Sequence, residues 1–111
     1  MVNHPRVDEV WLTSLDPTEG SESQKTRPCL VIAPNEMNRH LRTVIVAPMT
    51  SSLRPYATRV TVKFQSKQGQ VALAQIRAVD RQRLVRKLGS VSPKTAHAVG
   101  AVLVEMFTRQ G

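Results

Sequence analysis

Cysteine is almost absent from this chain of 111 residues. Cys29 stands alone, so no disulfide can form within the chain, and the histidines at positions 4, 40 and 97 do not have the spacing of zinc ligands. No apolar run approaches the roughly 20 residues that span a bilayer, and the N-terminal segment lacks the apolar stretch of a signal peptide. The sequence therefore predicts a cytoplasmic protein without structural metal, cofactor or membrane contact.

Aromatic residues make up only 4% of the chain, which is sparse for a protein that binds nucleic acid by stacking bases on several rings. The remaining composition, 41% hydrophobic and 22% charged, is that of a globular protein. At this length there is room for one hydrophobic core. We expect a single domain over residues 1–111, with a flexible N-terminus at residues 1–8.

Carboxylates are scarce beyond the first 22 residues. Those 22 residues hold five Asp or Glu and one arginine, whereas the rest of the chain holds fifteen Lys or Arg against three carboxylates. Arginine outnumbers lysine, and its planar guanidinium suits bidentate contacts to phosphate. The net charge of +8 therefore predicts a polyanionic partner, either a nucleic acid or an acidic protein segment, whose binding weakens with salt.

Apolar residues alternate or run together in segments of strand length. The expected strands cover residues 9–15, 28–33, 43–48, 58–64, 71–76 and, as an extended segment, 86–91. The polar segment 16–27 is predicted to be a long exposed loop, and segments 34–42 and 65–69 are predicted to be turns.

Two helical segments are expected near the C-terminus. Asp80 can cap a short helical turn through Leu84, although a longer amphipathic helix ending at Gly89 is an alternative. Ser92-Pro93 begins the final helix. Its apolar residues at helical spacing are Ala96, Val99, Leu103, Met106 and Phe107. Short strands followed by one terminal helix predict a small, strongly bent, mostly antiparallel β-barrel with the helix packed on it.

Three polar clusters remain outside the expected core. They are Gly20-Ser21-Glu22 with Arg27; Thr50-Ser51-Ser52; and Gln75 and Arg77 with the basic residues Arg81, Arg83, Arg86 and Lys87. None is specific alone, because Gly-Ser-Glu is commonly a turn and Thr-Ser-Ser a loop. We assign no function to the histidines, Cys29 or Trp11.

The order and intervals of four segments carry more information than any one of them. DPTEGSE, TRPCLVI, VIVAPMTSS and ALAQIRAVDRQRL together resemble the MazF/PemK/Kid family of toxin–antitoxin ribonucleases, over nearly the whole chain from Glu9 to the final helix. The resemblance implies a homodimeric, SH3-like barrel of the CcdB/PemK type. It also implies a toxin that cuts single-stranded mRNA at short sequences without metal, inhibits translation and growth, and is silenced by an acidic antitoxin.

The resemblance also implies site residues. By position, Arg27 matches the family's catalytic arginine in the loop before the second strand, Thr50 the hydroxyl residue after the third strand, and Glu22 the glutamate of the GSE motif. The residues expected to bind RNA are Ser21, Lys25, Ser51, Ser52, Gln75, Arg77, Arg81, Arg83 and Arg86. Ser21 stands where the PemK/Kid branch carries a histidine, and Ala74 where relatives carry an acidic residue, so no general acid is assigned.

Two other functions are kept as alternatives. The first is a non-enzymatic toxin of the same barrel type, like CcdB, which poisons DNA gyrase. A gyrase binder needs no polar cluster around a groove, so the set of Glu22, Arg27 and Thr50 favours the nuclease. The second is a nucleic-acid-binding barrel without catalysis. The low aromatic content argues against it, because few rings are present on which bases could stack.

Overall fold

The structure is a computed structural model that describes residues 4–16 and 25–109. Within these residues the strands are β1 (Glu9–Asp16), β2 (Lys25–Val31), β3 (Thr43–Thr50), β4 (Arg59–Phe64), β5 (Lys67–Ala72), β6 (Arg77–Asp80) and β7 (Leu84–Ser90). The helices are α1 (Asn35–His40) and α2 (Pro93–Phe107), with short 3-10 turns η1 (Leu73–Gln75) and η2 (Arg81–Arg83). None of the described helices is long and apolar enough to cross a membrane.

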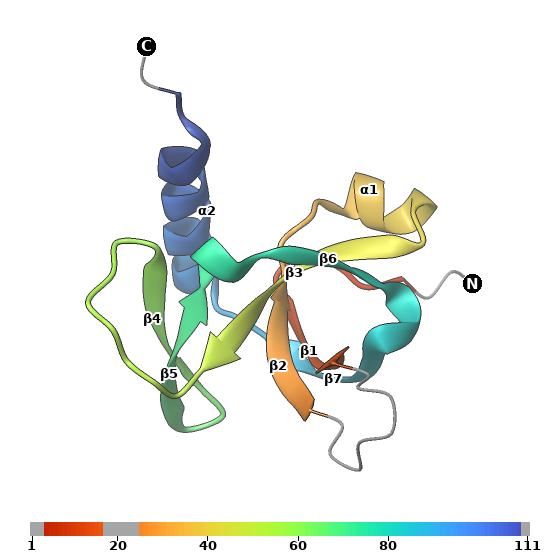
Figure 1. Ribbon diagram of the computed structural model, residues 1–111, viewed down its shortest axis with the longest axis horizontal. Helices are drawn as coiled ribbons and strands as arrows, with labels where there is room; N and C mark the ends of the chain where they lie inside the picture. Colours follow the sequence, from red (N-terminus) through yellow and green to blue (C-terminus); the bar gives the residue numbers. More distant parts are fainter. Residues whose placement is uncertain (1–3, 17–24, 110–111) are drawn as a thin grey trace.

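All strand pairs are antiparallel, in the order β4-β5-β3-β2-β1-β7, and β6 pairs with β3. The first half of β3 pairs with β6 and its last two residues, Met49 and Thr50, pair with β5. Strands β1, β2, β3, β6 and β7 curve into a ring, while β4, β5 and α2 lie together beside it (Figure 1). The expected bent, antiparallel β-fold with a C-terminal helix is confirmed.

Two core clusters lie on the two faces of this sheet, because successive residues of a strand point to opposite sides. The larger cluster includes Val10, Leu30 and Ala47 and contacts Val99 of α2. The smaller cluster includes Cys29 and Val46, with Trp11 packed against it. Both faces of the central strands are therefore covered, as their continuous apolar runs predict.

The α2 helix begins as predicted, because the Ser92 hydroxyl accepts a hydrogen bond from the Thr95 N–H and Pro93 is the first helical residue. Ala96, Leu103 and Met106 pack against the larger cluster. Phe107 was expected on the same face, but it is 65% exposed at the last residue of the helix. Phe107 is therefore not part of the buried face of α2, although Met106 beside it is.

Three other predicted boundaries were wrong. Segment 34–42 contains helix α1 rather than a simple turn, held by the buried Asn38 amide, which donates to the Ala33 carbonyl. Strand 71–76 is instead the end of β5 followed by η1. The turn 65–69 is only two residues long, since Gln65 and Ser66 take positive φ angles and β5 begins at Lys67.

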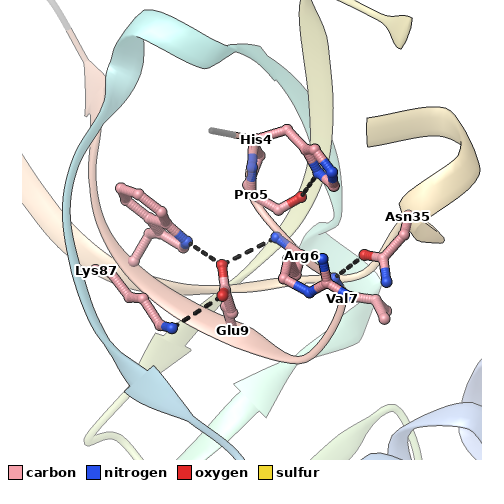
Figure 2. A network of polar contacts seen from close by, with 8 residues as sticks. His4, Pro5, Arg6, Val7, Glu9, Asn35 and Lys87 are labelled. Atoms are coloured by element: carbon pink, nitrogen blue, oxygen red, sulfur yellow. Dashed lines mark hydrogen bonds and ion pairs between the residues drawn. The ribbon is translucent and has the colours of Figure 1, made fainter. Parts of the chain in front are cut away.

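The last part of the expected flexible N-terminus is anchored to the barrel. The Val7 N–H donates to Asn35 Oδ1 at 2.8 Å. Glu9, only 7% exposed, accepts from the Arg6 N–H and the Trp11 indole and pairs with Lys87 at 3.0 Å (Figure 2). Burial acts to raise the pKa of the Glu9 carboxyl, but these donors hold that pKa below its ordinary value. Glu9 is thus an ionised structural residue at neutral pH.

Candidate active site

Arg27 lies within β2, not in the loop where the sequence predicted it. Its Cα is paired with that of Thr13 in β1, and the pairing continues to Lys25. β2 extends beyond its apolar residues because β1 pairs with the polar residues that precede them, from Lys25 to Arg27. Pro28, which has no N–H to donate, lies just beyond the last β2–β3 pair. The Arg27 side chain is exposed.

The sequence predicts a strand over residues 43–48 with Thr50 in the loop that follows, but β3 continues to Thr50, whose side chain is half-buried. The β2–β3 register pairs Cys29 with Pro48. Arg27 and Thr50 stand two residues beyond this pair on the two strands. Because side chains repeat every second residue on one face, Arg27 and Thr50 lie on the same face at the same end of these neighbouring strands.

A pocket of about 420 Å³ opens at this end of the sheet. It is lined by Thr26, Arg27, Pro28, Met49, Thr50, Ser51, Val62, Phe64, Gln65, Lys67, Gln68, Gly69 and Leu88. Arg27, Thr50 and Ser51, three residues that the sequence predicted for the site, therefore border one cavity. Lys67 adds a second cation that the sequence does not predict for the site, because its pattern indicates only a turn over residues 65–69.

Gly69 allows β5 to approach β3 closely at this point. A Cβ on Gly69 would stand 2.8 Å from the carbonyl oxygen of Thr50, closer than real Cβ atoms come to such an atom. A glycine here is therefore required by the path of the backbone beside Thr50.

The Thr50 hydroxyl accepts a hydrogen bond from the Ser52 N–H at 3.1 Å. A hydroxyl that accepts through one lone pair can still donate its proton to another group. Thr50 is thus suited to donate a hydrogen bond to an oxygen atom bound in the pocket.

Arg77 extends the basic face from the neighbouring strand. It is exposed and paired with Val46, which lies on the same face of β3 as Thr50. Arg27 lies on the same face of β2, so the two guanidinium groups create a positive potential over this face of the sheet.

The other residues predicted to bind RNA are spread more widely. Arg81 and Arg83 lie in η2, where their side chains donate to the carbonyls of Leu41 and Ser14. Arg81 lines a second pocket, with Glu9 and Lys87, rather than the one beside Arg27. The structure does not bring these two arginines together with Arg27.

The six remaining predicted positions do not line the pocket beside Arg27 or lie outside the described part of the chain. Gln75 in η1, Arg86 in β7 and Ser52 after β3 are exposed and do not line the pocket beside Arg27. Ser21 and Glu22 lie outside the described residues, as does the side chain of Lys25. Across residues 4–16 and 25–109 no group of three His, Cys, Asp or Glu side chains is arranged to hold a metal ion.

Comparisons with known proteins agree with this architecture. The family model for the PemK-like, MazF-like toxin of type II toxin–antitoxin systems matches residues 6–107. Endoribonuclease MazF of Staphylococcus saprophyticus is 33% identical over 95 residues, which cover 80% of this chain and 79% of the relative. Endoribonuclease PemK of Escherichia coli is 54% identical over 43 residues, 39% of this chain and 32% of PemK, so that match spans about a third of PemK.

Comparison with solved structures also gives endoribonuclease and MazF proteins. A mycobacterial endoribonuclease superposes with a TM-score of 0.76 at 25% identity, covering 93% of this chain and 90% of the other. A MazE–MazF complex from Deinococcus radiodurans contains a chain that is 26% identical, with a TM-score of 0.77 and coverage of 92% and 94%. The fold and the pocket thus define a small β-barrel toxin. The chain belongs to the PemK-like, MazF-like family of endoribonuclease toxins, and the resemblance expected from its sequence is confirmed.

Proposed function

We propose that this toxin cuts single-stranded mRNA at specific short sequences, without a metal ion, by attack of a ribose 2′-OH on the adjacent phosphate. The observation that carries the proposal is the placement of Arg27, Thr50 and Ser51 around one pocket on a basic face. An arginine and hydroxyl donors beside a cavity are suited to bind the phosphate of an RNA chain.

In this reaction the 2′-oxygen forms a bond to phosphorus and the bond from phosphorus to the 5′-oxygen breaks. The leaving 5′-oxygen takes up a proton, for which no side chain is assigned here, and the products are a 2′,3′-cyclic phosphate and a 5′-OH. Negative charge builds on the two non-bridging oxygens, and Arg27 stabilises it with Thr50 and Ser51 as hydroxyl donors from the pocket lining. We assign the removal of the 2′-OH proton to Glu22 by its position in the GSE motif. An arginine side chain holds its proton too tightly to donate it to the 5′-oxygen, so Arg27 acts through its charge.

We further propose that the active toxin is a cytoplasmic homodimer that an acidic antitoxin inhibits. One similar structure is a mycobacterial endoribonuclease in complex with its cognate antitoxin, and another is the MazE–MazF complex from Deinococcus radiodurans. The fifteen basic residues after position 22 would attract an acidic segment to the same face as RNA. Two copies related by a two-fold axis would also frame a longer groove than one barrel offers.

The CcdB-like gyrase poison is the second candidate, and it is disfavoured. The family match covers residues 6–107 and the matched relatives are endoribonucleases. The pocket beside Arg27 also has the polar residues that a nuclease needs and a gyrase binder does not.

We predict that the purified protein cuts a long single-stranded RNA in the presence of excess EDTA. The reason is that the proposed chemistry uses side-chain charge and hydroxyl donors rather than a metal-bound water. Gel analysis of the fragments measures the cleavage, and the Arg27→Ala protein purified in the same way is the control for contaminating nuclease. Cleavage that stops in EDTA and returns with magnesium would contradict the proposal, and RNA that stays intact would favour the gyrase alternative.

A further inference from the structure

Gln70 is a buried amide directly beside Thr50. Its side chain is 6% exposed, and its Cα is paired with Thr50 on one side and with Thr61 on the other. A buried amide costs free energy unless its polar atoms find partners. The hydrogen bonds of Gln70 therefore indicate which neighbouring groups it holds in place.

Every hydrogen-bonding position of the Gln70 amide is used. Its Oε1 accepts from the Arg54 N–H at 2.9 Å and from Arg59 Nη1 at 3.1 Å. Its Nε2 donates to the Arg54 carbonyl at 3.1 Å and to Thr61 Oγ1 at 3.2 Å. The orientation of the amide is determined by these partners, since an N–H and a guanidinium can only donate. Gln70 thus binds both backbone groups of Arg54, as a neighbouring strand would.

Arg59 connects Gln70 to the residues that follow Thr50. The same Nη1 that reaches Gln70 also donates to the Ser52 carbonyl at 3.0 Å, and the guanidinium lies 5.6 Å from the centre of the Tyr56 ring. The Ser52 N–H in turn donates to Thr50 Oγ1. A continuous series of hydrogen bonds therefore runs from Gln70 through Arg59 and Ser52 to the Thr50 hydroxyl.

We propose that Gln70 and Arg59 are positioning residues that hold Ser52 in place, so that the Thr50 hydroxyl accepts from Ser52 and donates its own proton to the RNA phosphate. The proposal rests on the ribonuclease function proposed above. Gln70 and Arg59 are not among the described residues that line the pocket, so in this proposal both act through Thr50. Small displacements of a group that contacts the reacting atoms cost large factors in rate; about 1 Å can cost about a hundredfold.

The test is a double-mutant cycle between Gln70→Met and Thr50→Ala. Methionine fills a similar volume without hydrogen bonds to Arg54 and Arg59. We expect Gln70→Met to lower the single-turnover rate of RNA cleavage by about tenfold to a hundredfold with little change in KM. In the Thr50→Ala protein the same substitution should change the remaining rate by less than about twofold, because coupled residues are not additive.

Gln82→Met is the matched control, since Gln82 is an exposed glutamine in η2. Its cleavage rate should stay within about twofold of wild type. Arg59→Met is the second variant if Gln70→Met does not fold, because it removes the link to Ser52 and should couple to Thr50 in the same way. A wild-type rate in Gln70→Met, or an equal loss with and without the Thr50 hydroxyl, would overturn the proposal.

Amide hydrogen exchange separates this proposal from the ribonuclease function. Gln70→Met should speed exchange of the Arg54 and Ser52 amides, while Gln82→Met should leave both unchanged. Unchanged exchange in folded Gln70→Met would show that Gln70 does not hold this segment, whatever the protein does to RNA. A wild-type protein that cleaves no RNA would instead contradict the proposed function itself.

Discussion

Arg27→Ala is expected to lower the rate of RNA cleavage by about a hundredfold to a thousandfold, the usual effect of removing one donor to a developing oxyanion. Arg27 is exposed near the start of β2, so its loss should leave the core intact and the melting temperature within a few degrees of wild type. Single-turnover cleavage and thermal unfolding, measured on the same preparations, test both parts of this prediction.

Two further variants test whether the loss of cleavage rate depends on the position of Arg27 and on the planar shape of its guanidinium group. Arg27→Lys keeps the charge but loses the planar fork, so it should recover only a small part of the rate. Arg39→Ala removes an exposed arginine from α1, away from the pocket, and should cut RNA at the wild-type rate. An Arg27→Ala protein that keeps the wild-type rate, or that has lost its unfolding transition, would contradict the assignment.

Thr50→Ala should lower the cleavage rate by a similar factor, about a hundredfold, because it removes the hydroxyl that we propose donates to the phosphate. Thr50→Ser keeps a hydroxyl that can accept from the Ser52 N–H, and it should restore most of the rate. The same single-turnover assay measures both variants.

The control for Thr50 is on the same strand. Thr43→Ala changes an exposed threonine at the opposite end of β3 and should leave the rate unchanged. If Thr50→Ser were as slow as Thr50→Ala, the hydroxyl would not be the group that matters, and Thr50 would act only through packing against β5.

Much of the fold follows from local sequence. The β-branched runs that begin at Thr43 and at Val60 lie in β3 and β4, and Ser92-Pro93 begins α2, because these signals lie within a few neighbouring residues. The start of β2 could not be predicted in this way. Its polar residues, including Arg27, are extended because β1 pairs with them, and that pairing joins residues far apart in the sequence.

The same limit applies to the candidate site. The resemblance to a toxin family supplied the positions of Arg27 and Thr50, and the strand register explains why they share one face. Gln70 carries no chemical signature in the sequence, since a glutamine among strand residues is usually exposed. Its role follows only from the hydrogen bonds it makes to a segment sixteen residues earlier.

The chemistry of the cut ends tests the central claim most directly. Once a cut site has been mapped in EDTA, two synthetic RNAs that span it are compared, one unmodified and one with a single 2′-deoxy nucleotide on the 5′ side of the cut. We predict 2′,3′-cyclic phosphate and 5′-OH ends from the first and no cleavage of the second, because the attacking 2′-OH is missing. Fragments with 5′-phosphate ends, or cleavage of the deoxy substrate at the same site, would contradict attack by the 2′-OH.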